Sequence, residues 1–325
     1  MVAAAVASAA MFSCRPEPGL GRITLQRRGA LHVVDLATCR ERVKPGHLGG
    51  GFFGSPLSSP DGRWTASVRS SGHGKSAKQT VWIKSRSTGR ARPVFSETQY
   101  YKTIGPGETP GPIVLRGWSG DGRWIFFFVD PGGSESIAAD GLTLRVVSVN
   151  SGRATKIARM LLYPDYLTWC GGRLVFTAGM DRVATNHKRL LVASPPLWRA
   201  RPLARAPGRA WGSLACAPSG RSLVAQSQPQ SSDPRFFSTH WALWRVGLDG
   251  SLRRLTSPPR GSADESPRFS RTGNVLLFVR MRRGNGMLYA LRGTRTVGAL
   301  LFLGNNIGYY GHHDWWLTAE WSRAR

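Results

Sequence analysis

The chain has 325 residues, of which 41% are hydrophobic, and it contains 39 glycines and 21 prolines. This content of glycine and proline excludes a mainly helical protein and favours many short strands joined by tight turns. Four cysteines do not make a disulfide scaffold, no Cys-x-x-Cys pair indicates a zinc site, and 45 basic against 18 acidic residues give a net charge of +27.

The positive charge has two interpretations. One is a polyanionic partner, such as an anionic wall polymer, an anionic lipid or a nucleic acid. The other is an arginine usage typical of a GC-rich genome, because the basic residues are spread along the chain without a run of five like charges. Nucleic acid is the least favoured of these partners, since no stripe of arginine and aromatic residues stands out.

The first residues resemble an export signal. Residues 1–12 are apolar and rich in alanine, and polar sequence begins at Ser13. We therefore expect an export-signal-like segment over 1–14, truncated at its start because the basic n-region is missing, and one domain over 15–325. Residues 11–14 match a lipoprotein box poorly, which leaves open whether Cys14 is lipidated or removed. No later segment has the 18 or so apolar residues of a membrane span, and export would place the protein in the periplasm, outside the cell or on its surface.

Three strands are predicted next, over 23–26, 31–36 and 41–43. A repeated unit then follows, in which a short strand leads through a polar turn into an apolar strand. Its turn residues are Asp61 and Gly62, Asp121 and Gly122, Gly172, Gly220 and Gly273. Asp-Gly favours a two-residue hairpin turn, because glycine adopts positive φ without steric cost and aspartate tolerates it. The turn glycines recur roughly every 50–60 residues, which is typical of propeller blades.

A second hairpin follows the first in each unit, for example at Ser87–Arg90 and Asn150–Arg153. Each unit thus has four antiparallel strands, the content of one blade. Five internal units are visible, and the three N-terminal strands lack a fourth, which we expect within 313–321. The predicted fold is all-β: a six-bladed β-propeller of four-stranded antiparallel blades, whose ring closes by pairing of the N- and C-terminal strands and so leaves no exposed edge.

The turn Ser59-Pro60-Asp61-Gly62-Arg63-Trp64 and its copies at Asp121 and Ser219 resemble the WD40-like repeat of bacterial TolB-like propeller proteins. The resemblance covers nearly the whole chain after the export-like segment. It implies the propeller fold, export, and a function in binding other proteins. A separate N-terminal domain like that of TolB is missing, because strands begin soon after residue 20, and the motif supplies turn residues only. The resemblance therefore implies no catalytic residue.

Residues for chemistry are sparse. The nearest string to a hydrolase elbow, Gly117-Trp118-Ser119-Gly120-Asp121, lacks the final glycine and lies in a blade turn. We predict no cofactor, no metal and no catalytic residue. The densest polar and aromatic cluster is the segment 309–315, where His312, His313 and Asp314 could act as acid and base or bind a metal; the alternative is that this segment packs the ring seam.

Loop lengths indicate where a ligand would bind. The connections over 70–79, 131–140, 180–188 and 226–239 are long, and in a propeller such connections share one face with the links between blades. We expect a ligand-binding rim formed by the charged residues of these segments. They are His73, Lys75, Glu135, Asp181, Arg182, His187, Asp233, Arg235, His312, His313 and Asp314.

Cys170 and Cys216 are predicted to form a disulfide. Both lie near the ends of first strands on consecutive blades, where first strands converge on the ring axis. The alternative is two separate buried thiols. Cys39 has no partner if Cys14 is lost with the signal.

The predicted function is that of an exported, non-enzymatic binding or scaffold module of the cell envelope. It would engage a protein or envelope partner through the face with the long loops, and we expect a monomer. One alternative is a lyase or hydrolase that uses histidine and acidic residues at the central opening. The other is a polyanion binder driven by the net charge.

Overall fold

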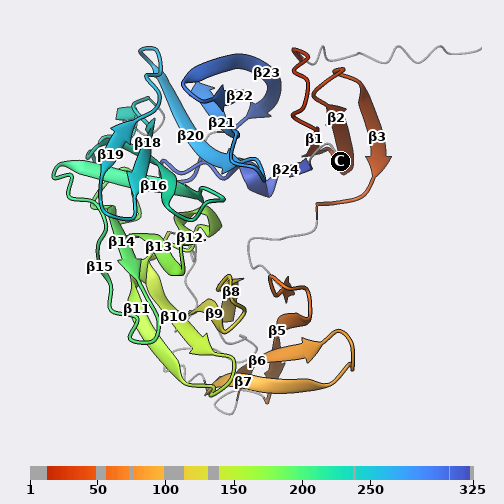
Figure 1. Ribbon diagram of the computed structural model, residues 1–325, viewed down its shortest axis with the longest axis vertical. Helices are drawn as coiled ribbons and strands as arrows, with labels where there is room; N and C mark the ends of the chain where they lie inside the picture. Colours follow the sequence, from red (N-terminus) through yellow and green to blue (C-terminus); the bar gives the residue numbers. More distant parts are fainter. Residues whose placement is uncertain are drawn as a thin grey trace, which may run out of the picture.

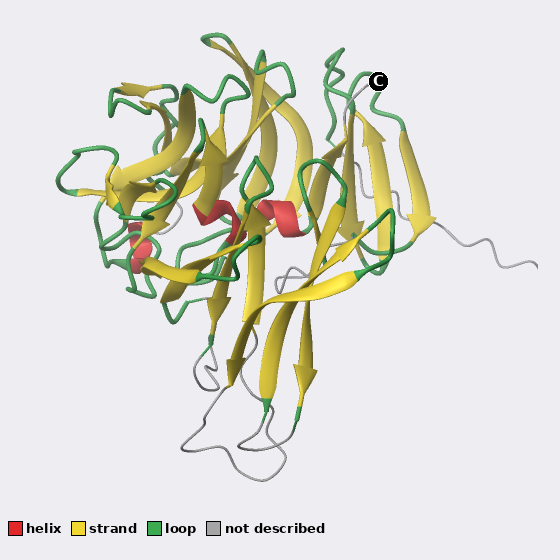
Figure 2. Ribbon diagram, turned by 60° about the horizontal axis from the view of Figure 1, so that its bottom comes forward, coloured by secondary structure: helices red, strands yellow, loops and turns green. Residues whose placement is uncertain are grey.

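The computed structural model describes residues 13–48, 56–72, 77–98, 113–130, 139–236, 239–306 and 308–322. Most of the export-like segment lies outside these ranges, as do three residues of the expected rim, His73, Lys75 and Glu135. The described part of the chain is built from strands and short 3-10 turns, which Figure 2 shows in yellow and red.

The strands form six four-stranded antiparallel sheets arranged around a common axis (Figure 1), as the repeat predicts. Along each blade the strands run in order from the axis outward, except that the C-terminal strand is the innermost of blade 1. Blade 1 contains β24 (Ala319–Ser322), β1 (Arg22–Arg27), β2 (Ala30–Asp35) and β3 (Glu41–Pro45); blade 2, β4 (Leu57–Ser58), β5 (Trp64–Ser71), β6 (Lys78–Ser85) and β7 (Ala91–Thr98); blade 3, β8 (Ile113–Trp118), β9 (Trp124–Val129), β10 (Leu142–Ser148) and β11 (Ala154–Met160). Blade 4 contains β12 (Leu167–Cys170), β13 (Arg173–Ala178), β14 (Arg189–Ala193) and β15 (Arg201–Pro202); blade 5, β16 (Arg209–Cys216), β17 (Ser222–Pro229), β18 (Ala242–Gly247) and β19 (Leu252–Arg254); blade 6, β20 (Ser262–Phe269), β21 (Val275–Arg282), β22 (Asn285–Arg292) and β23 (Arg295–Asn305).

The core lies between the blades. On β9, Ile125 and Phe127 pack in a cluster shared with blade 2, while Phe126 and Phe128 pack in a cluster shared with blade 4. Alternate side chains of a strand point to opposite faces of its sheet, so a strand buried on both faces is apolar throughout. Five such clusters join neighbouring blades from blade 2 round to blade 1; among the described residues, none joins blade 1 to blade 2.

The first turn of blades 2, 3, 5 and 6 differs from the predicted two-residue hairpin, whereas blade 4 has such a hairpin, with Gly171 and Gly172 between the paired Cys170 and Arg173. At the first copy, four residues separate Ser59 from Trp64, and the Ser59 hydroxyl accepts a hydrogen bond from the Trp64 amide at 2.9 Å. The Asp61 carboxylate accepts from the Ser59 hydroxyl and the Arg63 amide, so only Gly62 needs a positive φ, +70°. The hydrogen bonds of serine and aspartate replace the tight turn that the Asp-Gly pair alone suggests.

The ring closes as predicted, because β24 pairs antiparallel with β1 from Arg22↔Ser322 to Leu25↔Ala319. Trp321 donates its indole N–H to the Leu20 carbonyl at 2.6 Å. The strand is shorter than the predicted range 313–321: His313 and Asp314 belong to the link before it, and the 3-10 turn η4 (Trp315–Leu317) intervenes. A turn at this point lets the link carry its polar side chains to the axis.

A second contact strengthens the closure, and the sequence analysis did not predict it. Cys14 forms a disulfide with Cys39 in the turn between β2 and β3, with Cα atoms 5.8 Å apart. Residues 13–15 also pair with β23: the Arg15 amide donates to the Leu300 carbonyl at 2.8 Å, and Cys14 bridges to Leu301. Cys39 therefore has a partner in the chain that retains Cys14; the expectation that it has none applied to a chain from which Cys14 is removed. The structured chain begins at least as early as Ser13, two residues before the predicted domain boundary at 15.

The structure contains the disulfide expected between Cys170 and Cys216, with Cα atoms 5.4 Å apart. It joins the ends of the innermost strands of blades 4 and 5, β12 and β16. In the chain-entropy model, loops of 46 and 25 residues correspond to stabilisation by about 4 and 3.5 kcal/mol for Cys170–Cys216 and Cys14–Cys39.

The closure predicts the effect of a truncation. A chain that ends at Thr318 lacks β24, exposes the edge of β1 and loses the packing of Trp321. We expect its melting temperature to fall by roughly 10 °C or more, because each kcal/mol lost lowers the Tm of a domain this large by about 2–4 °C. The control is Glu320→Ala, an exposed position on β24 that should change the Tm little. Equal melting curves for the truncated and full-length chains, followed by circular dichroism, would contradict this closure.

Candidate functional site

The two faces of the ring differ in their connections. Because successive strands of a blade are antiparallel, the links between blades and the loops between second and third strands lie on one face, and the first hairpin turns lie on the other. The long connections over 179–188 and 230–241 lie on the first of these faces, which we call the long-loop face. Two of the expected connections are shorter than predicted, since residues 70, 71, 78 and 79 extend β5 and β6, and Gln226 lies within β17.

Asp181 organises the loop between β13 and β14. Its carboxylate accepts hydrogen bonds from the Val183 amide at 2.9 Å and the Asn186 side chain at 2.7 Å, and it lies 3.3 Å from the exposed His187 ring. The fully buried ammonium of Lys188 donates to three backbone carbonyls of this loop, those of Asp181, Val183 and Asn186, at 2.6–3.0 Å. Asp181 and Lys188 thus stabilise the conformation of the loop in which they lie.

The other charged residues of the expected rim form ion pairs nearby. Arg182 lies 2.6 Å from Asp140, and Asp233 accepts hydrogen bonds from Arg235, two residues along the chain. Arg182 and Arg235 remain more than half exposed. Within the described part of the rim, the charged side chains of Asp181, Arg182, Asp233 and Arg235 are thus paired with oppositely charged or polar neighbours, and both arginines face solvent.

His312, His313 and Asp314 do not lie on the rim. They lie at the centre of the ring, where His312 and His313 are 3% and 2% exposed. His312 stacks on Tyr163 with ring centroids 3.7 Å apart and meets Tyr166 edge-on at 5.0 Å. Its Nε2 lies 3.3 Å from Oδ1 of Asp165, which belongs to the 3-10 turn η2 (Pro164–Tyr166) in the link before β12.

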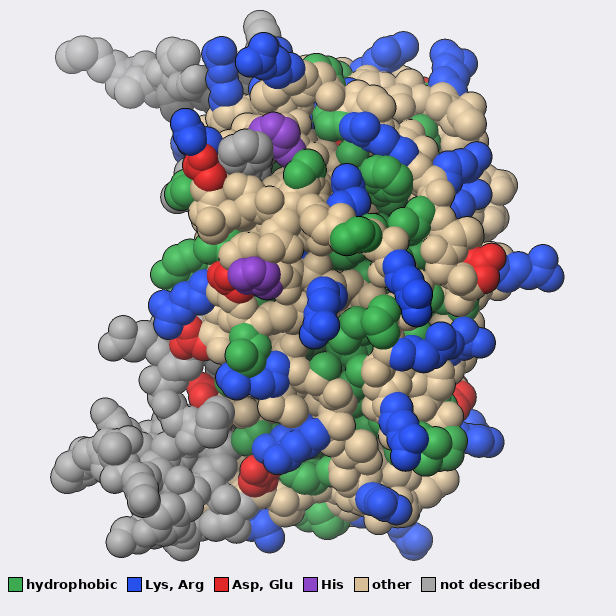
Figure 3. Space-filling model, turned by 90° about the vertical axis from the view of Figure 1, so that its left-hand side faces the viewer, with side chains coloured by type: hydrophobic (Ala, Val, Ile, Leu, Met, Phe, Trp, Pro, Cys, Tyr) green, Lys and Arg blue, Asp and Glu red, His purple; other side chains and the backbone are tan. Residues whose placement is uncertain are grey.

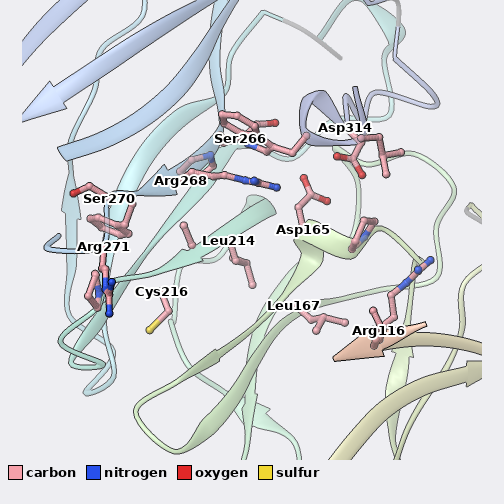
Figure 4. A pocket seen from close by; sticks show the side chains of 18 of the residues that line it. Arg116, Asp165, Leu167, Leu214, Cys216, Ser266, Arg268, Ser270, Arg271 and Asp314 are labelled. Carbon is pink, nitrogen blue, oxygen red and sulfur yellow. Dashed lines mark hydrogen bonds between the residues drawn. The ribbon is translucent and has the colours of Figure 1, made fainter. Parts of the chain in front are cut away.

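The three side chains Asp165, His312 and Asp314, which we call the axial cluster, have ligand-type atoms all within 4.8 Å of one another. Asp165 Oδ1, both ring nitrogens of His312 and Asp314 Oδ2 are buried, and none of these atoms has a hydrogen-bond partner. The other oxygen of Asp165, Oδ2, accepts a hydrogen bond from the Ser213 hydroxyl. Figure 4 shows the carboxylates of Asp165 and Asp314 turned toward the same space.

Buried Glu265 of β20 holds the link that carries the cluster. Its two carboxylate oxygens contact the Trp315 indole N–H at 2.8 Å and the His313 ring at 3.2 Å. The neighbouring Ser266 donates its hydroxyl to the His313 carbonyl and accepts from the Trp316 indole through its own carbonyl. Residues on either side of Asp314 are therefore anchored to blade 6.

Irregular pairing turns side chains toward the axis on three innermost strands. The register shifts lie between Leu115 and Gly117 on β8, between Trp211 and Leu214 on β16, and between Glu265 and Arg268 on β20. The skipped residues include Arg116, Ser213 and Ser266, all of which line the cavity or contact the cluster. Bulges re-aim side chains in this way and are common beside functional sites.

The axial cluster lies at one end of a cavity of about 680 Å³. Arg116 and Arg268 line its walls, and Arg268 stacks on Trp316 at 4.3 Å. The lining continues past Cys216 to Pro218, Ser270 and Arg271, which belong to first hairpin turns. Figure 4 shows this path from Asp165 to Arg271, so the cavity leads toward the face opposite the long loops.

Burial dominates the electrostatics of these groups. Burial, with the neighbouring charge of Asp165, raises the pKa of Asp314 to about 7, against the opposing effect of His312 and Arg268. Burial would lower the pKa of His312, but the charges of Asp165 and Asp314 outweigh it and raise that pKa. Burial lowers the pKa of Arg116 to about 10, so this guanidinium remains charged at neutral pH. The axis therefore holds two carboxyl groups that repel each other beside cationic walls.

Sequence reasoning missed Asp165, Arg116, Arg268 and Glu265. Asp165 lies in the link before β12, where the sequence has no motif. Arg116, Glu265 and Arg268 lie on innermost strands whose sequences look like those of the other repeats. One signal was available for Glu265: acidic Asp264-Glu265 occupies a strand position where the other blades have apolar or small residues. The remaining residues come from separate blades and carry no common spacing.

A different kind of surface lies on the long-loop face. Met180, Tyr309 and Tyr310 are large apolar residues with 47%, 45% and 39% exposure. The two tyrosine rings pack edge-on with centroids 4.8 Å apart, and the Tyr310 carbonyl accepts a hydrogen bond from the Ala184 amide of the adjacent loop. These residues form an exposed apolar patch beside Arg182.

The positive charge of the chain is not gathered at one site on the side that Figure 3 shows. Lys and Arg side chains are distributed over that whole surface, with few acidic side chains between them. No helix among the described residues is long and apolar enough to cross a membrane.

The contacts of Lys188 predict a structural role that a variant can measure. Lys188→Met would leave three partly buried carbonyls without this donor. A fully buried group left unsatisfied costs about 1–3 kcal/mol, and partly buried carbonyls cost less because water reaches them. We expect a loss of about 2–4 kcal/mol in the free energy of unfolding, measured by urea denaturation. Lys156→Met, at an exposed position on β11, is the control and should be within about 0.5 kcal/mol of the parent. A Lys188→Met chain as stable as this control would show that the carbonyls find other donors.

The comparisons with known proteins concern the fold. No protein-family model matches the sequence, and no curated protein matches it. The structure is similar to TolB from Acinetobacter baumannii, with 15% identity, a TM-score of 0.47, and coverage of 87% of this chain and 62% of that one. It is also similar to dipeptidyl peptidase 4 of Porphyromonas gingivalis, with 12% identity, a TM-score of 0.50, and coverage of 89% and 45%.

A third similar structure is the β-propeller domain of the Trilobed protease from Pyrococcus furiosus, with 12% identity, a TM-score of 0.47, and coverage of 83% and 73%. The chain thus spans about three fifths of TolB and less than half of the peptidase. At these identities the likeness concerns the fold alone. With its six four-stranded antiparallel sheets, the chain is in fold a six-bladed β-propeller.

Proposed function

We propose that the protein is an exported binding protein whose axial cavity takes a small ligand bearing a carboxylate or a phosphate. The observation that carries this proposal is the pair of arginines, Arg116 and Arg268, on the walls of a cavity of about 680 Å³. A cavity of this size is in the range of small-molecule sites.

The arginines in the cavity are suited to binding a carboxylate or a phosphate, which the dispersed positive charge of the surface is not. A guanidinium presents several donors in a planar fork that matches carboxylate and phosphate oxygens. Stacking on Trp316 fixes the plane of Arg268, and the bulge at Arg116 directs that side chain away from the sheet. A third arginine, Arg271, lines the same cavity from a first hairpin turn and adds to its attraction for anions.

Binding is favoured over catalysis by the state of the lining nucleophiles. Of the described lining residues, Cys216 is held in a disulfide, Ser266 donates its hydroxyl to a backbone carbonyl, and the Ser270 hydroxyl accepts from the Val275 amide within its turn. The alternative is a lyase or hydrolase that uses the axial cluster as acid and base. The raised pKa of Asp314 favours that alternative, because it keeps a carboxyl group partly protonated near neutral pH.

A second candidate function is protein binding through the long-loop face. Exposed tyrosine, methionine and arginine are enriched at the centres of interfaces, and Met180, Arg182, Tyr309 and Tyr310 provide them together. The partner would be another protein of the envelope. The two functions are separable, because Tyr309→Ser with Tyr310→Ser would remove the patch and leave Arg116 and Arg268 in place.

Ligand binding can be tested with glucuronate and inorganic phosphate as anionic probes and glucose as the neutral one. We expect the anions, but not glucose, to raise the melting temperature in a saturable way, since a ligand at 100 times its Kd adds about 2.7 kcal/mol of stability. Arg116→Gln and Arg268→Gln should each weaken binding at least about tenfold in isothermal titration calorimetry.

The control for this experiment is Arg235→Gln, which removes an exposed arginine from the long-loop face and should leave the affinity unchanged. The protein is stripped of metal with EDTA and dialysed into metal-free buffer before all titrations, so that no metal contributes and no EDTA competes with the anionic probes. If neither anion binds, or if both cavity variants bind as well as the parent, the proposed ligand class is wrong.

Export is supported by the disulfides. Both join cysteines that would stay reduced in most cytosolic compartments, and together they use all four cysteines of the chain. We expect peptide mapping of protein from its native source, without reduction, to recover Cys14–Cys39 and Cys170–Cys216 as linked peptides. Recovery of four alkylated thiols would contradict export and both pairings.

A further inference from the structure

The axial cluster contains buried polar atoms that the protein itself does not satisfy. His312 is 3% exposed, and neither of its ring nitrogens has a hydrogen-bond partner. Oδ1 of Asp165 and Oδ2 of Asp314 are buried and unsatisfied beside it. Most buried polar atoms in proteins have a partner, because one left without loses the hydrogen bonds that it makes with water in the unfolded chain. His312 Nε2 and Asp165 Oδ1 face each other at 3.3 Å with Asp314 beside them, so one ligand atom from each of the three residues can be satisfied by a single bound cation.

The spacing of these atoms is that of metal ligands. Asp165 Oδ1 and His312 Nε2 lie 3.3 Å apart but are not aligned as a hydrogen bond. Two ligand atoms about 2.0–2.1 Å from one zinc ion, at the tetrahedral angle, lie about 3.4 Å apart. The carboxylate of Asp314 lies within 4.8 Å of both, so a small shift of its side chain brings it to the same ion.

The surroundings orient the ligands as metal sites require. The Ser213 hydroxyl donates to Asp165 Oδ2 and leaves Oδ1 available. Tyr163 and Tyr166 fix the plane of the His312 ring, and Glu265 holds Trp315 directly after Asp314. The hydrogen bond from Ser213 behind Asp165 is of the kind found behind the ligands of natural metal sites. His312 is held by ring contacts instead, because its second ring nitrogen has no protein partner.

We propose that Asp165, His312 and Asp314 bind one divalent transition-metal ion at the propeller axis. One imidazole and two carboxylates suit Zn²⁺ or Mn²⁺. Asp165 and Asp314 line the cavity, so the positions of the ion not taken by the protein face the space bounded by Arg116 and Arg268. The ion would neutralise two carboxylates that otherwise repel each other. This inference goes beyond the binding of an anion and does not depend on it.

The test uses the full chain with its disulfides intact, stripped with EDTA and dialysed. Isothermal titration with ZnCl₂, and separately with MnCl₂, should give one site per chain for at least one of the two metals, and inductively coupled plasma mass spectrometry should recover one ion after desalting. Asp314→Asn should bind at least about tenfold more weakly. Its neutral amide removes the repulsion with Asp165, so its melting temperature should equal or exceed that of the parent. His312→Ala should lose the site.

The matched control is His187→Ala, which removes an exposed histidine paired with Asp181 on the long-loop face and should bind the metal like the parent. The proposal is overturned if neither Zn²⁺ nor Mn²⁺ binds stoichiometrically, or if folded Asp314→Asn and His312→Ala chains bind as tightly as the parent. Because the anion titrations use metal-free protein in metal-free buffer, loss of the metal site leaves their result unchanged, and the two proposals fail separately.

Discussion

The pairing of β24 with β1 is the interaction on which the rest of the structure depends. It joins the two ends of the ring through four residue pairs, and the link that leads into it carries His312, His313 and Asp314. The link lies at the centre of the ring because β24, to which it leads, is the innermost strand of blade 1. Closure therefore places the polar axis as well as stabilising the fold. The segment at residues 13–15, tied to blade 1 by Cys14–Cys39, fastens the same junction from its outer side.

The axis differs from the core in what it buries. Between the blades, packing is almost wholly apolar, as in the two faces of β9. Near the axis lie three carboxyl groups (Asp165, Glu265 and Asp314), two histidines (His312 and His313) and two arginines (Arg116 and Arg268). Buried charges cost stability unless they are paired. The irregular pairing of β8, β16 and β20 at this point, with a positive φ of +52° at Ser266, adds to that cost. Such a concentration of unfavourable features is typical of a functional site.

The two faces of the ring carry different features. The long-loop face carries solvated ion pairs and the tyrosine patch, and its loops are held by their own hydrogen bonds, as Lys188 and Asp181 show. The opposite face carries the first hairpin turns, and the cavity leads toward it. The residues from Tyr309 to Asp314 connect the two ends, because the tyrosines are exposed while the histidines are buried. A ligand at the axis and a partner on the long-loop face would thus contact the same short segment.

The sequence by itself determined the repeat, the four-stranded blades, their number and the strand that closes the ring, because turn residues and apolar runs are local features. The Cys170–Cys216 pair also followed from the repeat, since equivalent positions on neighbouring blades approach each other at the axis. Only the tertiary structure decided the site. Asp165, Arg116, Glu265 and His312 come from four different blades or links, and nothing in their spacing predicts that they meet. The bulges that turn them inward arise from how innermost strands crowd around the axis, which is a property of the closed ring and of no single segment.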